Sequence, residues 1–231
     1  MSVSQEQKIS STQTLKDDQN LQCQIQNFIR KKDFKSVIRI LHTNKKSRIN
    51  YQKLKYENQI YHVGQNLCIR GDNRSVYVAK LIKIVKLLDN QNNCIPFIKV
   101  QWFTRKTELM DLQKDYLDCI SENEVFKTNQ FDYIEIERII GLAIILSYEE
   151  YDHIEELNDN IFFMRASYID GKLFPSFDQW KKICVCQRPA NPDLKYILCE
   201  MCQQWFHLKC IGLHQDQAKK LNKYICSQCQ N

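Results

Sequence analysis

Cysteine and histidine side chains near the C-terminus have the number and spacing of metal ligands. Three cysteines and one histidine fall within the twelve residues CEMCQQWFHLKC, and four further cysteines lie on either side in close pairs. Each close pair places two donors on one tight turn, from which both reach a single tetrahedral ion. The sequence therefore predicts two closed zinc sites, whose ligands are Cys184, Cys186, Cys199, Cys202, His207, Cys210, Cys226 and Cys229.

These zinc sites are expected to stabilise the fold rather than to catalyse a reaction, because four protein donors leave no position for water. About fifty residues bury too little apolar surface to fold alone, and zinc binding contributes on the order of 10 kcal/mol per ion. Free thiols or disulfides are the alternative. Disulfides are typical of secreted chains, and the polar start MSVSQEQK does not have the apolar core of a signal peptide.

The cysteine-rich segment resembles a PHD finger. Four cysteines, one histidine and three cysteines follow in that family's order, with WFH at 205–207 and Tyr224 two positions before the seventh ligand. RING fingers usually place the histidine directly after the third ligand, so a ubiquitin ligase is the less favoured alternative. The resemblance implies an interleaved arrangement: one zinc ion bound by Cys184, Cys186, His207 and Cys210, the other by Cys199, Cys202, Cys226 and Cys229.

An aromatic residue beside these ligands indicates a second kind of chemistry. A trimethylated ammonium group carries a diffuse charge and donates no hydrogen bond, so electron-rich aromatic faces select it. Similar PHD fingers that bind histone H3 trimethylated at lysine 4 have such walls at the positions of Tyr196 and Trp205, which we expect to be exposed. An acidic residue at the position of Glu200 contacts the basic tail there. Two further wall positions hold Ile183 and Ala190, which implies modest affinity; ordinary packing of both rings is the alternative.

The remainder of the chain divides into segments of different composition. Residues 1–20 are rich in Ser, Gln and Thr and predict a flexible tail. Between Leu21 and His42 apolar residues recur at spacings of three and four, as on an amphipathic helix or helix pair with a basic opposite face. Residues 21–60 are therefore interpreted as a basic helical extension, followed by a domain at 61–179 and the zinc finger at 180–231.

The domain at 61–179 has the pattern of an all-β barrel. Short runs rich in Val, Ile, Tyr and Phe, such as FIKVQWF, are separated by turn signals such as DNQNN. In FIKVQWF, alternation places Ile98, Val100 and Trp102 on one face. This segment carries 19 acidic against 13 basic side chains, which favours a basic partner over DNA. The predicted fold class is mainly β: a distorted barrel, a small two-zinc finger and an N-terminal helical extension.

The barrel segment resembles a BAH domain over about residues 61–170, through stretches that include WFTRKTE, NEVF and FFMRASYI. In some BAH domains an aromatic cage binds histone H3 trimethylated at lysine 27. The resemblance places such a cage at Tyr77 and Trp102, with Glu108 as an acidic wall, and it puts Thr104 where a third aromatic residue is expected. The alternative is that Tyr77 and Trp102 are core residues of a barrel that serves as a scaffold.

A BAH domain followed directly by a PHD finger resembles the short plant BAH-PHD readers of the Early Bolting in Short Days and Short Life type. The resemblance implies a non-enzymatic nuclear protein that binds two zinc ions and the methylated histone H3 tail. Expected partners are the nucleosome and subunits of chromatin complexes, with weak or no direct DNA binding and no membrane contact. The alternative is a scaffold subunit of a chromatin or replication complex. The remaining cysteines and histidines show no nucleophile–base spacing, so no enzyme is predicted.

Overall fold

The fold was analysed in a computed structural model, which describes residues 33–43, 49–72, 75–88, 94–109, 112 and 114–230. The predicted tail at 1–20 and residues 21–32 and 44–48 of the predicted helical extension lie outside these ranges. Of the described residues of that extension, Phe34–Thr43 are helical, whereas Ile49–Tyr51, Lys53–Tyr56 and the start of Gln59–His62 are strands. Two compact units make up the chain: Met1–Trp102 with Gln130–Ala143, and Phe103–Asn129 with Ile144–Asn231.

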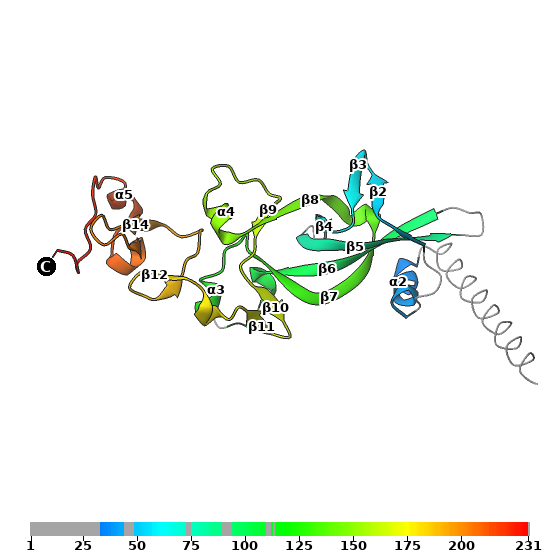
Figure 1. Ribbon diagram of the computed structural model, residues 1–231, viewed down its shortest axis with the longest axis horizontal. Coiled ribbons are helices and arrows are strands. Elements are labelled where there is room, and N and C mark those ends of the chain that lie inside the picture. The colour runs from blue at the N-terminus through cyan, green and yellow to red at the C-terminus, as the bar shows by residue number, and fades with distance from the viewer. Residues whose placement is uncertain are drawn as a thin grey trace, which may run out of the picture. The chain divides into compact units, whose positions relative to one another are not determined.

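One sheet of nine strands contains most of the β structure (Figure 1). Its strand order is β11-β10-β7-β6-β5-β4-β8-β9, and β1 also pairs with β5. The strands β2 and β3 form a separate antiparallel hairpin. The bounds are β1 Ile49–Tyr51, β2 Lys53–Tyr56, β3 Gln59–His62, β4 Asn66–Arg70, β5 Val76–Leu88, β6 Cys94–Arg105, β7 Val125–Glu135, β8 Ile139–Leu146, β9 Ile161–Phe163, β10 Ser167–Ile169 and β11 Lys172–Phe174.

The first unit is built around apolar side chains of strands β4, β5 and β6. Leu81, Ile84, Ile98 and Val100 are all fully buried in one cluster, and Trp102 packs against it. This confirms that Ile98, Val100 and Trp102 share the inward face of β6, as strand alternation predicts. The barrel is therefore stabilised by its own β-branched and aromatic residues.

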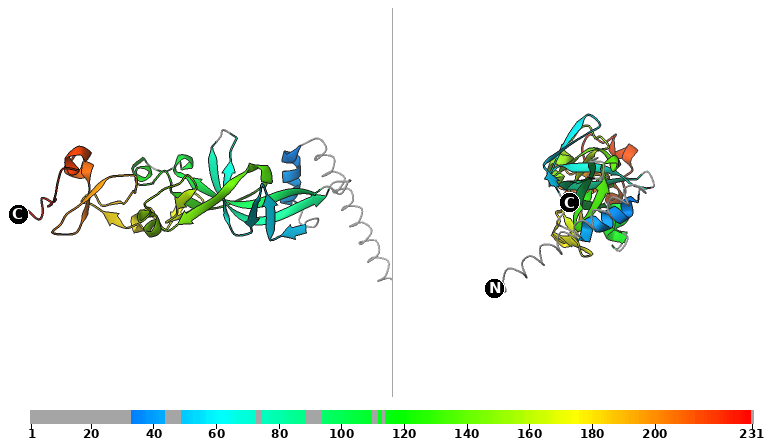
Figure 2. Two further views of the ribbon diagram at one scale, coloured as in Figure 1. Left: turned by 90° about the horizontal axis from the view of Figure 1, so that it is seen from above. Right: turned by 90° about the vertical axis from the view of Figure 1, so that its right-hand side faces the viewer.

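A helix covers part of the first unit. Helix α2 (Phe34–Thr43) begins after Asp33, whose carboxylate accepts the N–H of Ser36 at 3.2 Å, a typical N-cap interaction. On its apolar face Val37 and Leu41 are buried with Phe97 and other residues of the strands. Figure 2 shows this helix, in blue, beside those strands. The apolar face that the sequence predicts is thus covered by the chain itself.

The second unit contains the other end of the barrel strands and the cysteine-rich finger. Trp180 is 6% exposed and packs with Leu109, Ile120 and Phe126. Its ring lies parallel to that of Phe126. The predicted mainly-β fold class with a small finger is confirmed. The remaining elements are α3 Lys114–Leu117, α4 Tyr148–Asp152, α5 Gln215–Ala218, β12 Lys182–Ile183, β13 Arg188–Pro189, β14 Tyr196–Leu198, β15 Trp205–His207 and the 3₁₀ turns η1 Lys106–Glu108, η2 Ile136–Arg138, η3 Phe177–Gln179 and η4 Leu208–Ile211.

Candidate zinc centres and aromatic face

The eight predicted ligands form two groups of four. Within each group every donor atom lies within 4.8 Å of the others. The interleaved pairing is the one implied by the resemblance to PHD fingers, and it joins the beginning, middle and end of the finger. The groups are Cys184, Cys186, His207 and Cys210, and Cys199, Cys202, Cys226 and Cys229.

The donor distances fit tetrahedral zinc. Zn–S bonds of about 2.3 Å place two sulfur ligands about 3.8 Å apart, and the Sγ atoms of Cys202 and Cys226 are 3.8 Å apart. In the other group Nδ1 of His207 lies 3.4 Å from Sγ of Cys186. Backbone N–H groups of Cys202 and Cys226 lower the pKa of the Cys199 thiol to about 6, which favours the thiolate that zinc binds. Two zinc ions fit these donors, and four donors close each site.

Tight turns hold the close ligand pairs. The N–H of Gln187 donates to the carbonyl of Cys184 at 3.2 Å, and the N–H of Gln203 donates to the carbonyl of Cys199 at 2.9 Å. Cys184, Gln187 and Gln203 have φ values of 69°, 53° and 57°. Non-glycine residues adopt this left-handed region at a cost. The turn hydrogen bonds offset part of that cost, and zinc coordination would offset more of it.

Strands β14 and β15 present the predicted aromatic residues. They pair antiparallel, with Tyr196 opposite His207 and Leu198 opposite Trp205. These four side chains share one face because alternate residues point to the same side, whereas Phe206 is buried in the core of the finger. Among the described residues β14 has no second partner strand. Its outer edge is therefore open to a peptide strand.

The two rings differ in exposure. Trp205 is 49% exposed, as expected. Tyr196 is half-buried: its ring centroid lies 4.6 Å from that of His207, and its hydroxyl donates to the carbonyl of Asn191 at 3.0 Å. Burial raises the pKa of Tyr196 to about 12, so the phenol is neutral at physiological pH. The structure thus gives one exposed ring and one fixed ring instead of two exposed rings.

The other positions predicted near the aromatic face also differ from one another. Glu200 lies 3.6 Å from Lys223, but both side chains are well exposed, so solvent weakens the pair and leaves Glu200 available to a cationic ligand. Ile183 is half-buried. Ala190 is 9% exposed, and its carbonyl accepts a hydrogen bond from Arg165 at 2.7 Å. The position of Ala190 is therefore enclosed within the second unit.

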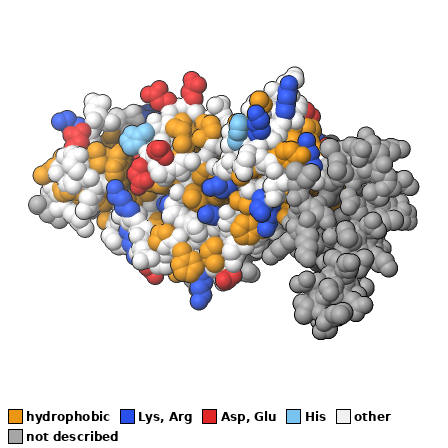
Figure 3. All heavy atoms as spheres, turned by 45° about the vertical axis from the view of Figure 1, so that its right-hand side comes forward, with side chains coloured by type: hydrophobic (Ala, Val, Ile, Leu, Met, Phe, Trp, Pro, Cys, Tyr) orange, Lys and Arg blue, Asp and Glu red, His pale blue; other side chains and the backbone are white. Residues whose placement is uncertain are grey.

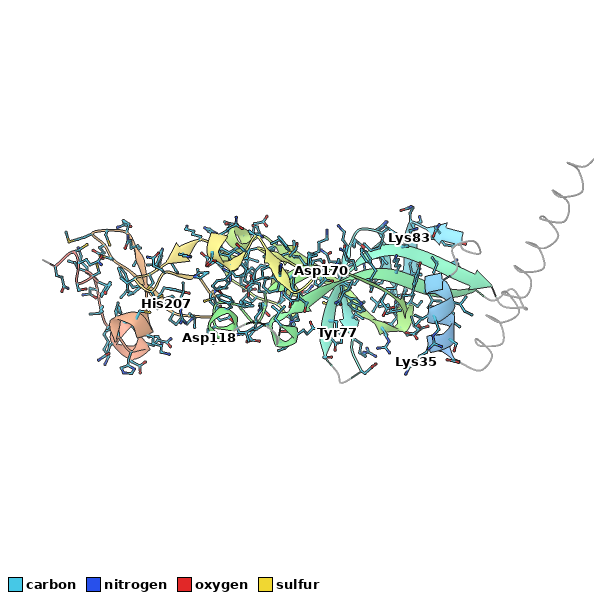
Figure 4. The ribbon with its side chains drawn as sticks, turned by 90° about the horizontal axis from the view of Figure 1, so that it is seen from below. Lys35, Tyr77, Lys83, Asp118, Asp170 and His207 are labelled. Carbon is cyan, nitrogen blue, oxygen red and sulfur yellow. The ribbon has the colours of Figure 1, made fainter. Side chains whose placement is uncertain are left out.

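The predicted cage of the barrel contains two aromatic rings. Tyr77, labelled in Figure 4, and Trp102 have ring centroids 6.0 Å apart at 69° to each other, and both pack against the core of the first unit. Glu108 belongs to the second unit. Its carboxylate accepts the N–H of Arg105 at 2.9 Å and the hydroxyl of Thr104 at 3.4 Å, so it caps the turn η1. The structure brings the two rings together and gives Glu108 a local structural role.

Comparison with protein families agrees with this architecture. Residues 59–175, half of the chain, match the BAH domain family. The chain belongs to the BAH domain family. Residues 184–229 match the PHD-finger family. The BAH domain is therefore followed closely by a PHD finger, and the finger's family accounts for the order of the eight ligands.

Known relatives share this domain order or the finger alone. The chain is 28% identical over 181 residues to the Chromatin remodeling protein SHL of Arabidopsis thaliana, covering 77% of this chain and 76% of the relative. It is also 28% identical over 182 residues to the Chromatin remodeling protein EBS of the same plant, covering 76% and 73%. The Nucleosome-remodeling factor subunit NURF301 of Drosophila melanogaster is 40% identical over 47 residues, which are 20% of this chain and 2% of that protein.

The sequence did not identify three residues that lie where the BAH domain contacts the PHD finger: Glu124, Arg165 and Asn191. Arg165 forms a buried ion pair with Glu124, and Asn191 holds the hydroxyl of Tyr196. The lone charge within the apolar stretch FFMRASYI was the available signal for Arg165. No pattern in the sequence marks Asn191, because the carbonyls that its side-chain amide contacts, those of Asp118 and Ile120, lie more than seventy residues away.

The distribution of charged side chains on the described surface is relevant to the kind of partner that the protein binds. On the face shown in Figure 3, acidic and basic side chains are interspersed over the described elements. That face does not present the continuous basic surface that binds a nucleic-acid backbone. No helix in the described ranges is long and apolar enough to cross a membrane.

Proposed function

We propose that this protein is a non-enzymatic chromatin reader of the nucleus, and that its PHD finger binds the histone H3 tail trimethylated at lysine 4. The two plant relatives that align with about three quarters of the chain are named chromatin remodeling proteins. In the PHD finger both zinc sites are closed by four protein donors, which is typical of structural rather than catalytic zinc.

The observation that carries the proposal is the half-exposed ring of Trp205 beside the open edge of β14. Trp205 lies on the same face as Tyr196, and two aromatic faces attract a methylated ammonium group. A peptide that adds to β14 as a strand gains backbone hydrogen bonds, while the rings select its side chain. The exposed carboxylate of Glu200 supports the same ligand, because the H3 tail is basic.

A peptide titration tests this function. Fluorescence anisotropy of the full chain with H3 peptides should show about 3- to 30-fold tighter binding of the lysine 4 trimethylated form than of the unmodified form, the range of one cation–π contact. Trp205→Ala should remove the difference while two zinc ions remain by elemental analysis. Leu221→Ala, also on an exposed apolar residue of the PHD finger (44%), is the matched control and should bind as the parent does. Equal binding of both peptides by the parent would overturn the proposal.

For the BAH domain we propose a second methyl-lysine site at Tyr77 and Trp102, with trimethylated lysine 27 as the first ligand to test. Its support is the near-perpendicular pair of rings. The competing function is a scaffold that holds a chromatin or replication complex together. If no peptide binding depends on methylation, and pull-downs recover an assembly that is lost on deletion of residues 21–48, the scaffold function replaces the reader function.

A further inference from the structure

A loop of the PHD finger docks onto the BAH-domain part of the second unit. We define the docking loop as residues 189–193 and the docking segment as residues 118–124, both of which belong to that unit. Pro189, Ala190 and Asn191 of the docking loop are buried. Asp118 of the docking segment and His207 of the finger, both labelled in Figure 4, line one pocket with Asn191. The aromatic face is therefore built next to a contact between the two domains.

Asn191 uses all its polar groups within this contact. Its side-chain amide donates to the carbonyls of Asp118 at 3.0 Å and Ile120 at 3.4 Å, and its side-chain oxygen accepts the N–H of Asp193 at 3.0 Å. Its backbone N–H donates to the hydroxyl of Tyr196 at 2.8 Å, and its carbonyl accepts the proton of that hydroxyl at 3.0 Å. One residue thus joins the docking segment to an aromatic wall.

Two further contacts fix the docking loop from either side. The carboxylate of Asp193 accepts the hydroxyl of Ser121 and the N–H of Glu122, both at 2.8 Å. Arg165 donates to the carbonyl of Ala190 at 2.7 Å and to Glu124 at 2.7 and 2.9 Å. Hydrogen bonds to charged groups are shorter and stronger than neutral ones. The backbone that anchors Tyr196 is therefore held at several points.

We infer that Asn191 is a positioning residue for methyl-lysine recognition. Its side chain binds the docking segment of the BAH domain, and its backbone thereby holds the ring of Tyr196 in place. The inference rests on the proposed function of that ring. A phenol held at its hydroxyl end loses less freedom when a ligand binds against its face, and such preorganisation raises affinity. Asn191 itself does not need to touch the peptide.

A double-mutant cycle tests this role. Asn191→Ala removes the side-chain amide, and Tyr196→Phe removes the anchored hydroxyl but keeps the aromatic wall. Each variant should weaken binding of the trimethylated peptide by about tenfold, and the double variant should be no weaker than the single ones, because both changes break one coupled unit. Asn129→Ala is the matched control, since the side-chain amide of Asn129 donates to Asp170 at 3.0 Å in the same unit, outside the docking loop and the docking segment, and its loss should leave peptide affinity unchanged.

A spectroscopic readout separates positioning from loss of structure. In the full chain labelled with 3-fluorotyrosine, the fluorine resonance that is absent from Tyr196→Phe should shift in Asn191→Ala and stay in place in Asn129→Ala, with two zinc ions retained in each. If Asn191→Ala binds the peptide as the parent does, or if the two single effects add in the double variant, the inference is overturned while the reader function stands. If the parent protein binds methylated and unmethylated peptides equally, both the inference and the proposed reader function are overturned.

Discussion

Trp205 lies opposite Leu198 across the β14–β15 hairpin, two pairs along from Tyr196 and His207. The two aromatic side chains are therefore diagonal neighbours on one face of the hairpin. In the proposed function, a methyl-lysine side chain between them would meet one ring that is anchored at its hydroxyl and one that is half-exposed. The two walls consequently contribute in different ways, and substitutions should distinguish them.

Substitution of Trp205 by phenylalanine should weaken binding of the trimethylated peptide by only a few-fold, because a smaller aromatic face remains. Trp205→Ala should cost about 0.5–2 kcal/mol of binding free energy, the usual range of a cation–π contact. Isothermal titration calorimetry with methylated and unmethylated peptides measures both. An affinity that rises from the alanine variant through the phenylalanine variant to the parent supports a cation–π contact. Equal affinities of the phenylalanine and alanine variants would contradict it.

Removal of zinc should unfold the PHD finger, because its core consists largely of the ligands themselves with a few apolar residues such as Phe206. A chelator should abolish peptide binding and expose the finger to protease. The thiolates must be deprotonated to bind zinc, so protons compete and zinc should leave as pH falls, not as it rises. We therefore expect zinc release on acidification from neutral pH, measured with a zinc indicator. Loss of zinc between pH 7 and 9 would contradict this expectation.

Arg165→Met should destabilise the second unit by about 3–5 kcal/mol, because it leaves the buried carboxylate of Glu124 without its partner. Burial raises the pKa of Glu124 and Arg165 opposes that shift, so loss of the guanidinium should favour the protonated acid. Denaturant unfolding measures the change in free energy. Arg138→Met is the control, in the first unit; its ion pair with Asp72 is exposed and its ion pair with Glu135 is only partly buried, so its loss should cost less than about 1 kcal/mol. Equal costs for the two variants would contradict the assignment.

Gly71→Ala should disturb the ring of Tyr77, because an added Cβ atom would lie 2.4 Å from that ring. Overpacking of this kind costs about 1–3 kcal/mol. Gly141→Ala is the matched control in the same unit, since nothing lies within 4 Å of its added Cβ. Thermal melting measures both changes. If Tyr77 also forms a methyl-lysine wall, binding of the lysine 27 peptide should fall in Gly71→Ala and remain in Gly141→Ala; unchanged binding in both would leave Tyr77 as a core residue only.

Much of the architecture follows from short-range rules of the chain. Zinc requires four donors at fixed distances, so the spacing from Cys184 to Cys229 predicts both sites, and the resemblance to PHD fingers implies their interleaving. Alternation along FIKVQWF predicts the inward face of β6, because side chains of a strand point to opposite sides in turn. The three- and four-residue spacing of Val37 and Leu41 likewise predicts the apolar face of α2.

Only the tertiary structure decided what those faces and rings contact. The apolar face of α2 is covered by Phe97 and Tyr133, and the hydroxyl of Tyr196 is anchored through Asn191 to Asp118. Such contacts join residues that lie far apart along the chain and form only when both elements are folded. Local spacing fixes which side chains a metal or a strand brings together, whereas hydrogen bonds between distant segments depend on the packing of the whole unit.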